Sequence, residues 1–356
     1  MELKDQVLHA LSKVNDPELH RSLTDLQMVR DVYVNNSSVE VTIALTIPDC
    51  PMKDEIEADV YSAIIALPEV EEVAVHMTTM TDQERKAILG EPKEGTAAQY
   101  NHIQRVIAVM SGKGGVGKSL VTSILAVALA QSGYHVGVLD ADITGPSIPK
   151  LFGLHGPLEA GPVGIFPLTS ESGVKVMSIN LLMEEEDKPV VWRGPMIGKA
   201  ITQLWGDVMW GDLDYLLVDL PPGTSDASLT TLQSIPVSGI IMVTTPQSLA
   251  SLIVRKAVHM AQFVGTPIIG VVENMAYFKC PDTGKQHLIF GPSHADEVSK
   301  AAGAPMMARL PIDPLVTSLC DAGKVEAVTL PETKELLIAF LKEARVSMKA
   351  PENLGN

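Results

Sequence analysis

The chain has 356 residues, of which 46% are hydrophobic, so it is long enough for two or three domains and is not disordered. Its 27 Lys and Arg against 43 Asp and Glu give a net charge of −16, and its aromatic content is 4%. The charge disfavours broad binding to nucleic acid or to an anionic membrane, and the low aromatic content argues against stacking platforms for single-stranded nucleic acid. Three scattered cysteines, no signal-peptide pattern and no apolar run of ~18 residues predict a cytoplasmic protein without disulfides or a membrane span.

Residues 1–90 are predicted to form a small α+β domain. The segments Val32–Val34 and Val39–Ile47, separated by N-N-S-S, are typical of a β-hairpin, and apolar residues alternate along the second segment. Apolar residues at helical spacing across 52–67 predict a helix, and Val73–Met77 predicts another strand. With a helix at the start, the order helix, strand, strand, helix, strand indicates a small sheet covered by helices.

Residues 91–102 are predicted to be a linker, because the stretch from Gly90 to Tyr100 has no apolar periodicity. Residues 103–345 are predicted to form an α/β domain with a mostly parallel sheet flanked by helices, and residues 346–356 a flexible tail. The near-continuously apolar segments that predict buried parallel strands are 105–110, 135–140, 215–219, 239–245 and 267–274. The helices expected in this domain include 118–132, 248–264 and 333–344.

A glycine-rich loop gives the strongest functional signal. The segment G-K-G-G-V-G-K-S directly follows the first of these strands and opens a helix, so it matches G-x-x-x-x-G-K-[ST] in the context that this pattern requires. Backbone N–H groups of such a loop point at phosphate oxygens, and the helix N-terminus adds partial positive charge. The pattern predicts a P-loop nucleotide site made of Gly112, Lys113, Gly114, Gly115, Val116, Gly117, Lys118 and Ser119.

Acidic residues at two strand ends are expected to complete this site. Asp219 ends L-D-Y-L-L-V-D and suits indirect Mg²⁺ binding, with a strand-end turn as its alternative role. Asp140 and Asp142 lie in V-L-D-A-D-I-T-G-P-S. Because the carboxyl ends of parallel strands meet at the ligand, one of the two is expected to orient an attacking water. Helix capping or turn formation is the alternative at either position.

The residue after Gly112 narrows the motif to a family. Lys113 gives K-G-G-V-G-K-S, which resembles the deviant phosphate loop of the MinD-like ATPases. The chain also resembles their Mrp/ApbC branch, whose members are iron–sulfur cluster carriers or scaffolds that hydrolyse ATP slowly. This resemblance runs from about Arg105 to Asp313 and rests on D-A-D-I-T-G-P-S-I-P, W-R-G-P-M, W-G-D-L-D-Y-L-L-V-D-L-P-P-G-T-S-D, V-T-T-P-Q and V-V-E-N-M-A-Y-F.

The N-terminal segment resembles the metal–sulfur cluster assembly domain that is often fused ahead of these ATPases. The residues that carry the likeness are D-P-E at Asp16–Glu18, S-L-T-D-L-Q-M-V at Ser22–Val29 and L-T-I-P-D-C-P at Leu45–Pro51. That domain usually has Gly at the position of Gln27.

The resemblance implies roles for individual residues. Lys113 is implied to reach across a nucleotide-sandwich homodimer to the partner's phosphates, and Lys118 to bind phosphate within its own subunit. Asp142 becomes the preferred water-positioning carboxylate. The remaining implied roles are Mg²⁺ binding by Ser119 and Asp219, a γ-phosphate contact and switch at Gly223, adenine recognition by Asn274 and a place near the base for Pro311.

The cysteines depart from the family pattern. Members of this branch typically carry C-x-x-C after N-M-x-Y-F, so that two subunits offer four thiolates to one [4Fe–4S] cluster. Here F-K-C-P-D-T-G-K has Cys280 but Thr283 in place of the second cysteine, and a hydroxyl is a poor iron ligand. Cys280 is a ligand of a labile or incomplete cluster, a leftover thiol or a packing residue. Cys50, near a predicted helix start, is either a reactive, transiently iron-binding thiol or a buried one, and Cys320 is expected to be structural.

Three functions are weighed. The preferred one is an ATPase and homodimeric iron–sulfur cluster carrier that serves apo iron–sulfur proteins, with ATP, Mg²⁺ and a [4Fe–4S] cluster as ligands. The second is a nucleotide-dependent adaptor without its own cluster. The third is a MinD/ParA-like positioning ATPase, which the charge of −16 disfavours because that class needs a basic face for DNA or a basic amphipathic helix for membranes. Neither nucleic acid nor membrane is expected as a partner.

Overall fold

The computed structural model describes residues 2–17, 21–45, 52–81, 84, 96–143, 145–156, 158, 161, 164–182, 194–224, 226–247 and 249–346. Cys50, residues 91–95 of the predicted linker and residues 347–356 of the predicted tail lie outside these ranges. The chain divides into two compact units. The smaller comprises residues 1–101, 159–166 and 206–211, and the larger comprises the rest. The predicted boundaries at 90 and 102 stay a prediction.

The smaller unit has the predicted order of elements. They are α1 (Leu3–Leu11), β1 (Val29–Asn35), β2 (Ser38–Leu45), α2 (Lys53–Ile65) and β3 (Glu72–Thr79). β2 is the middle strand, antiparallel to β1 and parallel to β3. The alternating residues Val39, Val41, Ile43 and Leu45 of β2 are all buried, which confirms the predicted core face. A 3-10 helix at Thr96–Tyr100 occupies part of the segment predicted as a linker, and its Ala97 is buried.

Gln27 adopts a backbone conformation that favours glycine. It has φ +50° in the turn just before β1, where the backbone N–H of Met28 donates to the carbonyl of Leu23 at 2.8 Å. A side chain in this left-handed region costs roughly 1 kcal/mol relative to glycine. Glycine would therefore adopt the backbone conformation of residue 27 at a lower cost than glutamine.

The larger unit is built on an eight-stranded sheet. Its order is β15-β12-β11-β5-β10-β6-β8-β7, and every neighbouring pair is parallel except β7 with β8. The eight strands are β5 (Val106–Ser111), β6 (Val136–Asp140), β7 (Leu168–Thr169), β8 (Lys175–Ser178), β10 (Tyr215–Asp219), β11 (Gly239–Thr244), β12 (Ile268–Glu273) and β15 (Met306–Arg309). Two short pairs lie outside this sheet: β4 (His102–Ile103) with β9 (Asp212–Leu213), and β13 (Phe278–Lys279) with β14 (Gln286–His287).

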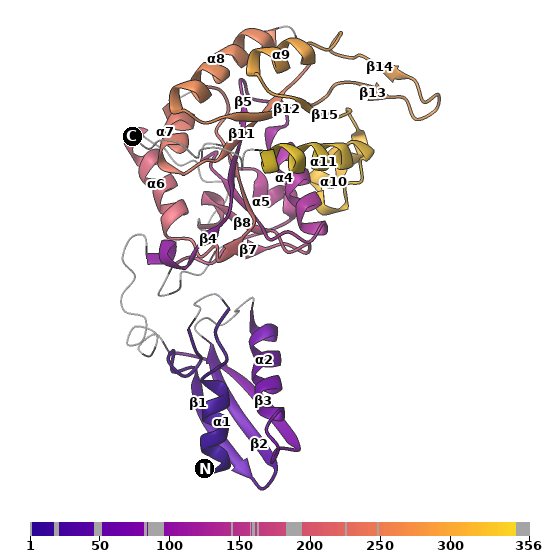
Figure 1. Cartoon of the computed structure of the whole chain (residues 1–356). Coiled ribbons are helices and arrows are strands. Elements are labelled where there is room, and N and C mark those ends of the chain that lie inside the picture. Colours follow the sequence, from indigo (N-terminus) through magenta and orange to yellow (C-terminus); the bar gives the residue numbers. More distant parts are fainter. Residues whose placement is uncertain are drawn as a thin grey trace. The chain divides into compact units, whose positions relative to one another are not determined.

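Helices cover the sheet on both faces, with α4 and α11 on one and α7 and α8 on the other (Figure 1). The α-helices are α4 (Lys118–Gln131), α5 (Ile148–Phe152), α6 (Gly194–Gly206), α7 (Asp226–Ser234), α8 (Leu249–Val264), α9 (Ala295–Ala302), α10 (Pro314–Asp321) and α11 (Pro331–Val346), and 3-10 helices span Ile179–Leu182 and Val325–Ala327. The five predicted strands and three predicted helices are confirmed with small shifts at their ends. In the described part of the chain, no helix is long and apolar enough to cross a membrane.

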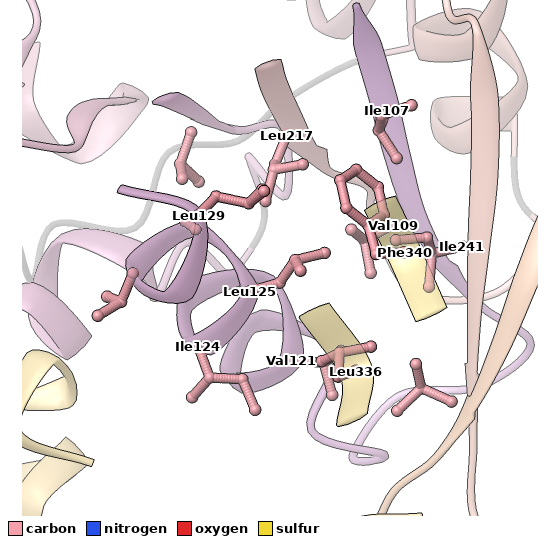
Figure 2. Close-up of a cluster of buried hydrophobic side chains, with 14 of the residues drawn as sticks. Ile107, Val109, Val121, Ile124, Leu125, Leu129, Leu217, Ile241, Leu336 and Phe340 are labelled. Carbon is pink, nitrogen blue, oxygen red and sulfur yellow. The ribbon is translucent and has the colours of Figure 1, made fainter. Parts of the chain in front are cut away.

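The core of the larger unit lies where α4 meets α11 and the central strands. Figure 2 shows Leu125 and Leu129 of α4 among side chains of β5, β10 and β11, with Phe340 of α11 beside them. Phe340 is fully buried and its ring meets that of Tyr215 edge to face, with centroids 5.2 Å apart. Packing on this side holds α4, and therefore the loop before it, against the sheet.

We predict that Phe340→Ala lowers the free energy of unfolding of the larger unit by about 3–5 kcal/mol, because it removes a buried aromatic ring and leaves a cavity. Urea denaturation followed by near-ultraviolet circular dichroism measures this loss. Phe263→Ala is the control, since Phe263 is 74% exposed. Equal stability of the two variants would contradict the predicted contribution of Phe340.

Candidate nucleotide-binding site

The glycine-rich loop lies between β5 and α4, as predicted. Gly117 is the residue before α4 and has φ +78°, a conformation that glycine adopts at little cost. A Cβ at this position would collide with the side-chain nitrogen of Asn274. Glycine is therefore required at 117 both by the backbone angle and by the close approach of a second segment.

Asn274 braces this loop from the end of β12. Its Nδ2 donates to the carbonyl of Val116 at 2.9 Å, and its Oδ1 accepts the backbone N–H of Met275 at 2.9 Å. The side chain is almost fully buried. In this structure its polar atoms serve the protein itself, so adenine recognition by Asn274 stays a prediction.

Asp219 is the electrostatic centre of the site. It ends β10, is fully buried, and lies 2.7 Å from the ammonium group of Lys118 through Oδ2. The hydroxyl of Ser119 donates to the same oxygen at 2.6 Å. The hydroxyl of Thr122 lies 2.9 Å from Oδ1 and 3.1 Å from the carbonyl oxygen of Lys118. The structure thus brings together three predicted residues, Lys118, Ser119 and Asp219, and adds Thr122.

Thr122 is the residue of this cluster that the motif does not contain. It lies three residues after Ser119 on α4, and positions three apart share a helix face. That spacing is the signal in the sequence that could have identified it.

Asp140 lies beside Asp219 because the strands that they end, β6 and β10, pair in register at these two residues. Its carboxylate accepts backbone N–H groups of Asp142, Ser147 and Ile148 at 3.2, 2.9 and 3.0 Å. Burial and the negative charge of Asp219 raise the pKa of Asp140 to about 7. Asp140 therefore holds the backbone between β6 and the start of α5. This contact corresponds to the alternative role, helix capping or turn formation, that the sequence leaves open for it. Asp142 is only half-buried.

Gly223 is held against the phosphate loop. It has φ +81°, and its N–H donates to the carbonyl of Ser111, the last residue of β5, at 3.0 Å. The hydroxyl of Ser228 lies 3.2 Å from the carbonyl of Gly223. The L-P-P-G segment between β10 and α7 is thus tied to the residue just before the phosphate loop. The N–H of Gly223 that makes this bond is the group predicted to contact a γ-phosphate.

Lys113 and Pro311 are two further predicted residues whose surroundings the structure describes. The Lys113 ammonium donates to the side-chain oxygen of Gln247, a residue that the predicted site does not include. Pro311 lines a cavity of about 390 Å³ together with residues of 277–281, 312–315 and 330–332. The hydroxyl of Tyr277 donates a hydrogen bond to Oε1 of Glu332 there, at 2.6 Å.

Cys280 is at the turn of the β13–β14 hairpin, which reaches outward from the larger unit (Figure 1). Hydrogen bonds from the Thr283 hydroxyl and from the backbone of Thr283 and Asp282 lower the pKa of its thiol. Cys320, in contrast, packs in the core, and burial raises the pKa of its thiol. Among the described residues, no three of the types His, Cys, Asp and Glu are grouped closely enough to hold a metal ion.

The match to known families covers almost the whole chain. Residues 102–344 match the family described as NUBPL iron-transfer P-loop NTPase, and residues 4–76 match iron-sulfur cluster assembly protein. The chain belongs to the NUBPL iron-transfer P-loop NTPase family. The resemblance drawn from its motifs is therefore confirmed for both parts.

Two relatives match this chain over nearly their full length, and a solved structure matches about two thirds of it. A protein from Synechocystis sp. named iron-sulfur cluster carrier protein is 41% identical over 97% of this chain and 98% of its own. One of the same name from Aquifex aeolicus is 38% identical, covering 98% and 99%. The solved structure of a nucleotide-binding protein from Archaeoglobus fulgidus in complex with ADP is 44% identical. It covers 66% of this chain and 92% of its own, with a TM-score of 0.60.

We predict that Thr122→Val lowers the free energy of unfolding by about 1–3 kcal/mol, because the buried carboxylate of Asp219 loses a hydrogen-bond donor and gains none. Urea denaturation without nucleotide or Mg²⁺ measures the effect. Thr122→Ser is the matched control, since it keeps the hydroxyl, and should remain within about 1 kcal/mol of the wild type. The same loss in both variants would mean that the methyl group, not the hydroxyl, matters.

Proposed function

We propose that this chain binds ATP with Mg²⁺ and hydrolyses it. The observation that carries the proposal is the Asp219 cluster, in which a buried carboxylate, the P-loop lysine and the Ser119 hydroxyl converge at the start of α4. The oxygen atoms of Ser119 and Asp219 lie 2.6 Å apart and are the hard ligands that Mg²⁺ prefers, so the donor set fits this ion. Bound Mg²⁺ would neutralise charge that develops on the phosphates.

Hydrolysis requires a positioned water and positive charge around the γ-phosphate. Lys118 supplies charge within the subunit, and the partner's Lys113 supplies it across a homodimer. Asp142 is the proposed carboxylate for orienting the water, because the resemblance assigns it this role and its side chain is only half-buried. Gly223 would exchange its bond to Ser111 for one to the γ-phosphate, and would return to it after hydrolysis.

The proposed cargo is an iron–sulfur cluster that is delivered to apo iron–sulfur proteins. Membership of an iron-transfer family, the names of the full-length relatives and the N-terminal assembly match support this role. Cys280 is the proposed ligand, since its place in the hairpin turn, where it is only partly buried, and its lowered pKa favour a thiolate that iron can reach. Two subunits then offer two Cys280 thiolates rather than four, so the cluster is held by fewer protein thiolates than in a C-x-x-C dimer and is labile.

A nucleotide-dependent adaptor without its own cluster is the second candidate. The observation in its favour is Thr283, whose hydroxyl hydrogen-bonds to the Cys280 thiol where the family pattern has a second thiolate. In this case the nucleotide would stabilise a dimer and the N-terminal unit would recruit partners.

Two lysine substitutions test the ATPase. Lys118→Ala is expected to abolish ATP binding, because it removes the loop cation that is proposed to bind phosphate. In this structure the same cation pairs with Asp219. Lys113→Ala is expected to retain ATP binding and to lose most turnover, since its proposed role is in the transition state of the partner's reaction. Isothermal titration and phosphate release measure the two steps. Unchanged turnover in Lys113→Ala would remove the trans-acting role.

Anaerobic reconstitution with iron and sulfide tests the cargo. The wild type is expected to gain iron, sulfide and a visible chromophore that transfers to an apo-ferredoxin, and Cys280→Ala to lose most of it. Cys320→Ser controls for the loss of a thiol that lies in the core. If active wild type binds ATP but never acquires a transferable cluster, the carrier role fails and the adaptor is favoured.

A further inference from the structure

We propose that Gln247 is a positioning residue, which holds the Lys113 ammonium of its own subunit at the phosphate loop until a phosphate oxygen replaces it. The Lys113 ammonium donates to Gln247 Oε1, although 134 positions separate the two residues in the chain. This inference rests on the proposed function, because it concerns the lysine assigned to the γ-phosphate.

The sheet places the two residues together. β5 and β11 are parallel neighbours, and Ser111 pairs with Val243 near their carboxyl ends. The chain leaves these strands at the same edge, where β5 continues into the phosphate loop and β11 into T-T-P-Q. The Ser111 hydroxyl also donates to the carbonyl of Lys113 at 3.0 Å, which fixes the backbone of that residue. The contact therefore joins two segments whose positions the central sheet sets.

The acceptor is neutral, and this sets the strength of the contact. Lys118 is paired with a carboxylate, whereas the acceptor of Lys113 is the amide oxygen of Gln247. No ion pair among the described residues includes Lys113. Hydrogen bonds between two charged partners are stronger than those with one neutral partner. Gln247 can thus orient the ammonium in the free subunit and still yield it to an anionic phosphate. A carboxylate at 247 would hold it more tightly.

Changing the charge of residue 247 at nearly constant shape tests the proposal in the full-length protein. Gln247→Glu is expected to lower ATP turnover about tenfold, because Lys113 must leave an ion pair to reach phosphate. Gln247→Met, of similar length but without an acceptor, is expected to change turnover less than about threefold. Gln262→Glu is the matched control, since it adds the same charge at an exposed position of α8 and should behave as the wild type.

Nuclear magnetic resonance of protein labelled with ¹³C-lysine gives a readout that does not depend on hydrolysis. The Lys113 Cε resonance, assigned with Lys113→Arg, is expected to move in Gln247→Glu and in Gln247→Met and to stay in place in Gln262→Glu. Addition of Mg²⁺ and a non-hydrolysable ATP analogue is expected to shift the wild-type resonance more readily than that of Gln247→Glu.

The outcomes separate this proposal from the proposed function. An unmoved Lys113 resonance in both Gln247 variants, or an equal loss of turnover in Gln247→Glu and Gln247→Met, overturns the positioning role. If Lys113→Ala retains full turnover, the trans-acting lysine fails, and the resonance shifts alone then decide whether Gln247 holds Lys113.

Discussion

The burial of Asp219 is the constraint on which the site depends. A carboxylate with no exposed surface is stable only where cations and hydrogen-bond donors surround it, and Asp219 takes all of its observed side-chain partners from the first turn and a half of α4. This requirement fixes the start of α4 against the end of β10. The phosphate loop, which is the segment between β5 and α4, is held at both ends as a result.

The site holds a second buried carboxylate, so its acidic side chains outnumber the ammonium group that pairs with them. Asp140 lies in register with Asp219, and only one ammonium, that of Lys118, pairs with a carboxylate here among the described residues. Burial, and then the negative charge of Asp219, raise the pKa of Asp140, because its carboxylate must ionise away from water and beside a second carboxylate. Mg²⁺ bound by Asp219 would relieve this repulsion. An anionic nucleotide therefore gains from arriving together with a divalent cation, which fits the preference of P-loop sites.

The elements that could be predicted from the sequence are those whose signal is local. β5, β6, β10, β11 and β12 are continuous apolar runs, and the glycine-rich loop is a contiguous motif. β8 and β15 were missed because each has only four residues. Gln247 was missed for another reason: its contact is to Lys113, 134 positions away, and such a contact exists only once the strands are ordered in the sheet. Thr122 was missed although its place three residues after Ser119 is a local signal, because the motif itself ends at Ser119.

The same ordering links the nucleotide site to the proposed cargo thiol. Asn274 contacts the phosphate loop, and the chain then runs through Phe278, which forms a parallel bridge with Ile312, to Cys280. Only five residues lie between Asn274, which braces the loop, and Cys280. Met275, between them, has φ +56°, a strained value for a non-glycine residue. A movement of the phosphate loop on nucleotide binding would displace Asn274 first. Because Phe278 is bridged to Ile312, such a displacement would have to move or break this bridge before it reached Cys280 in the hairpin.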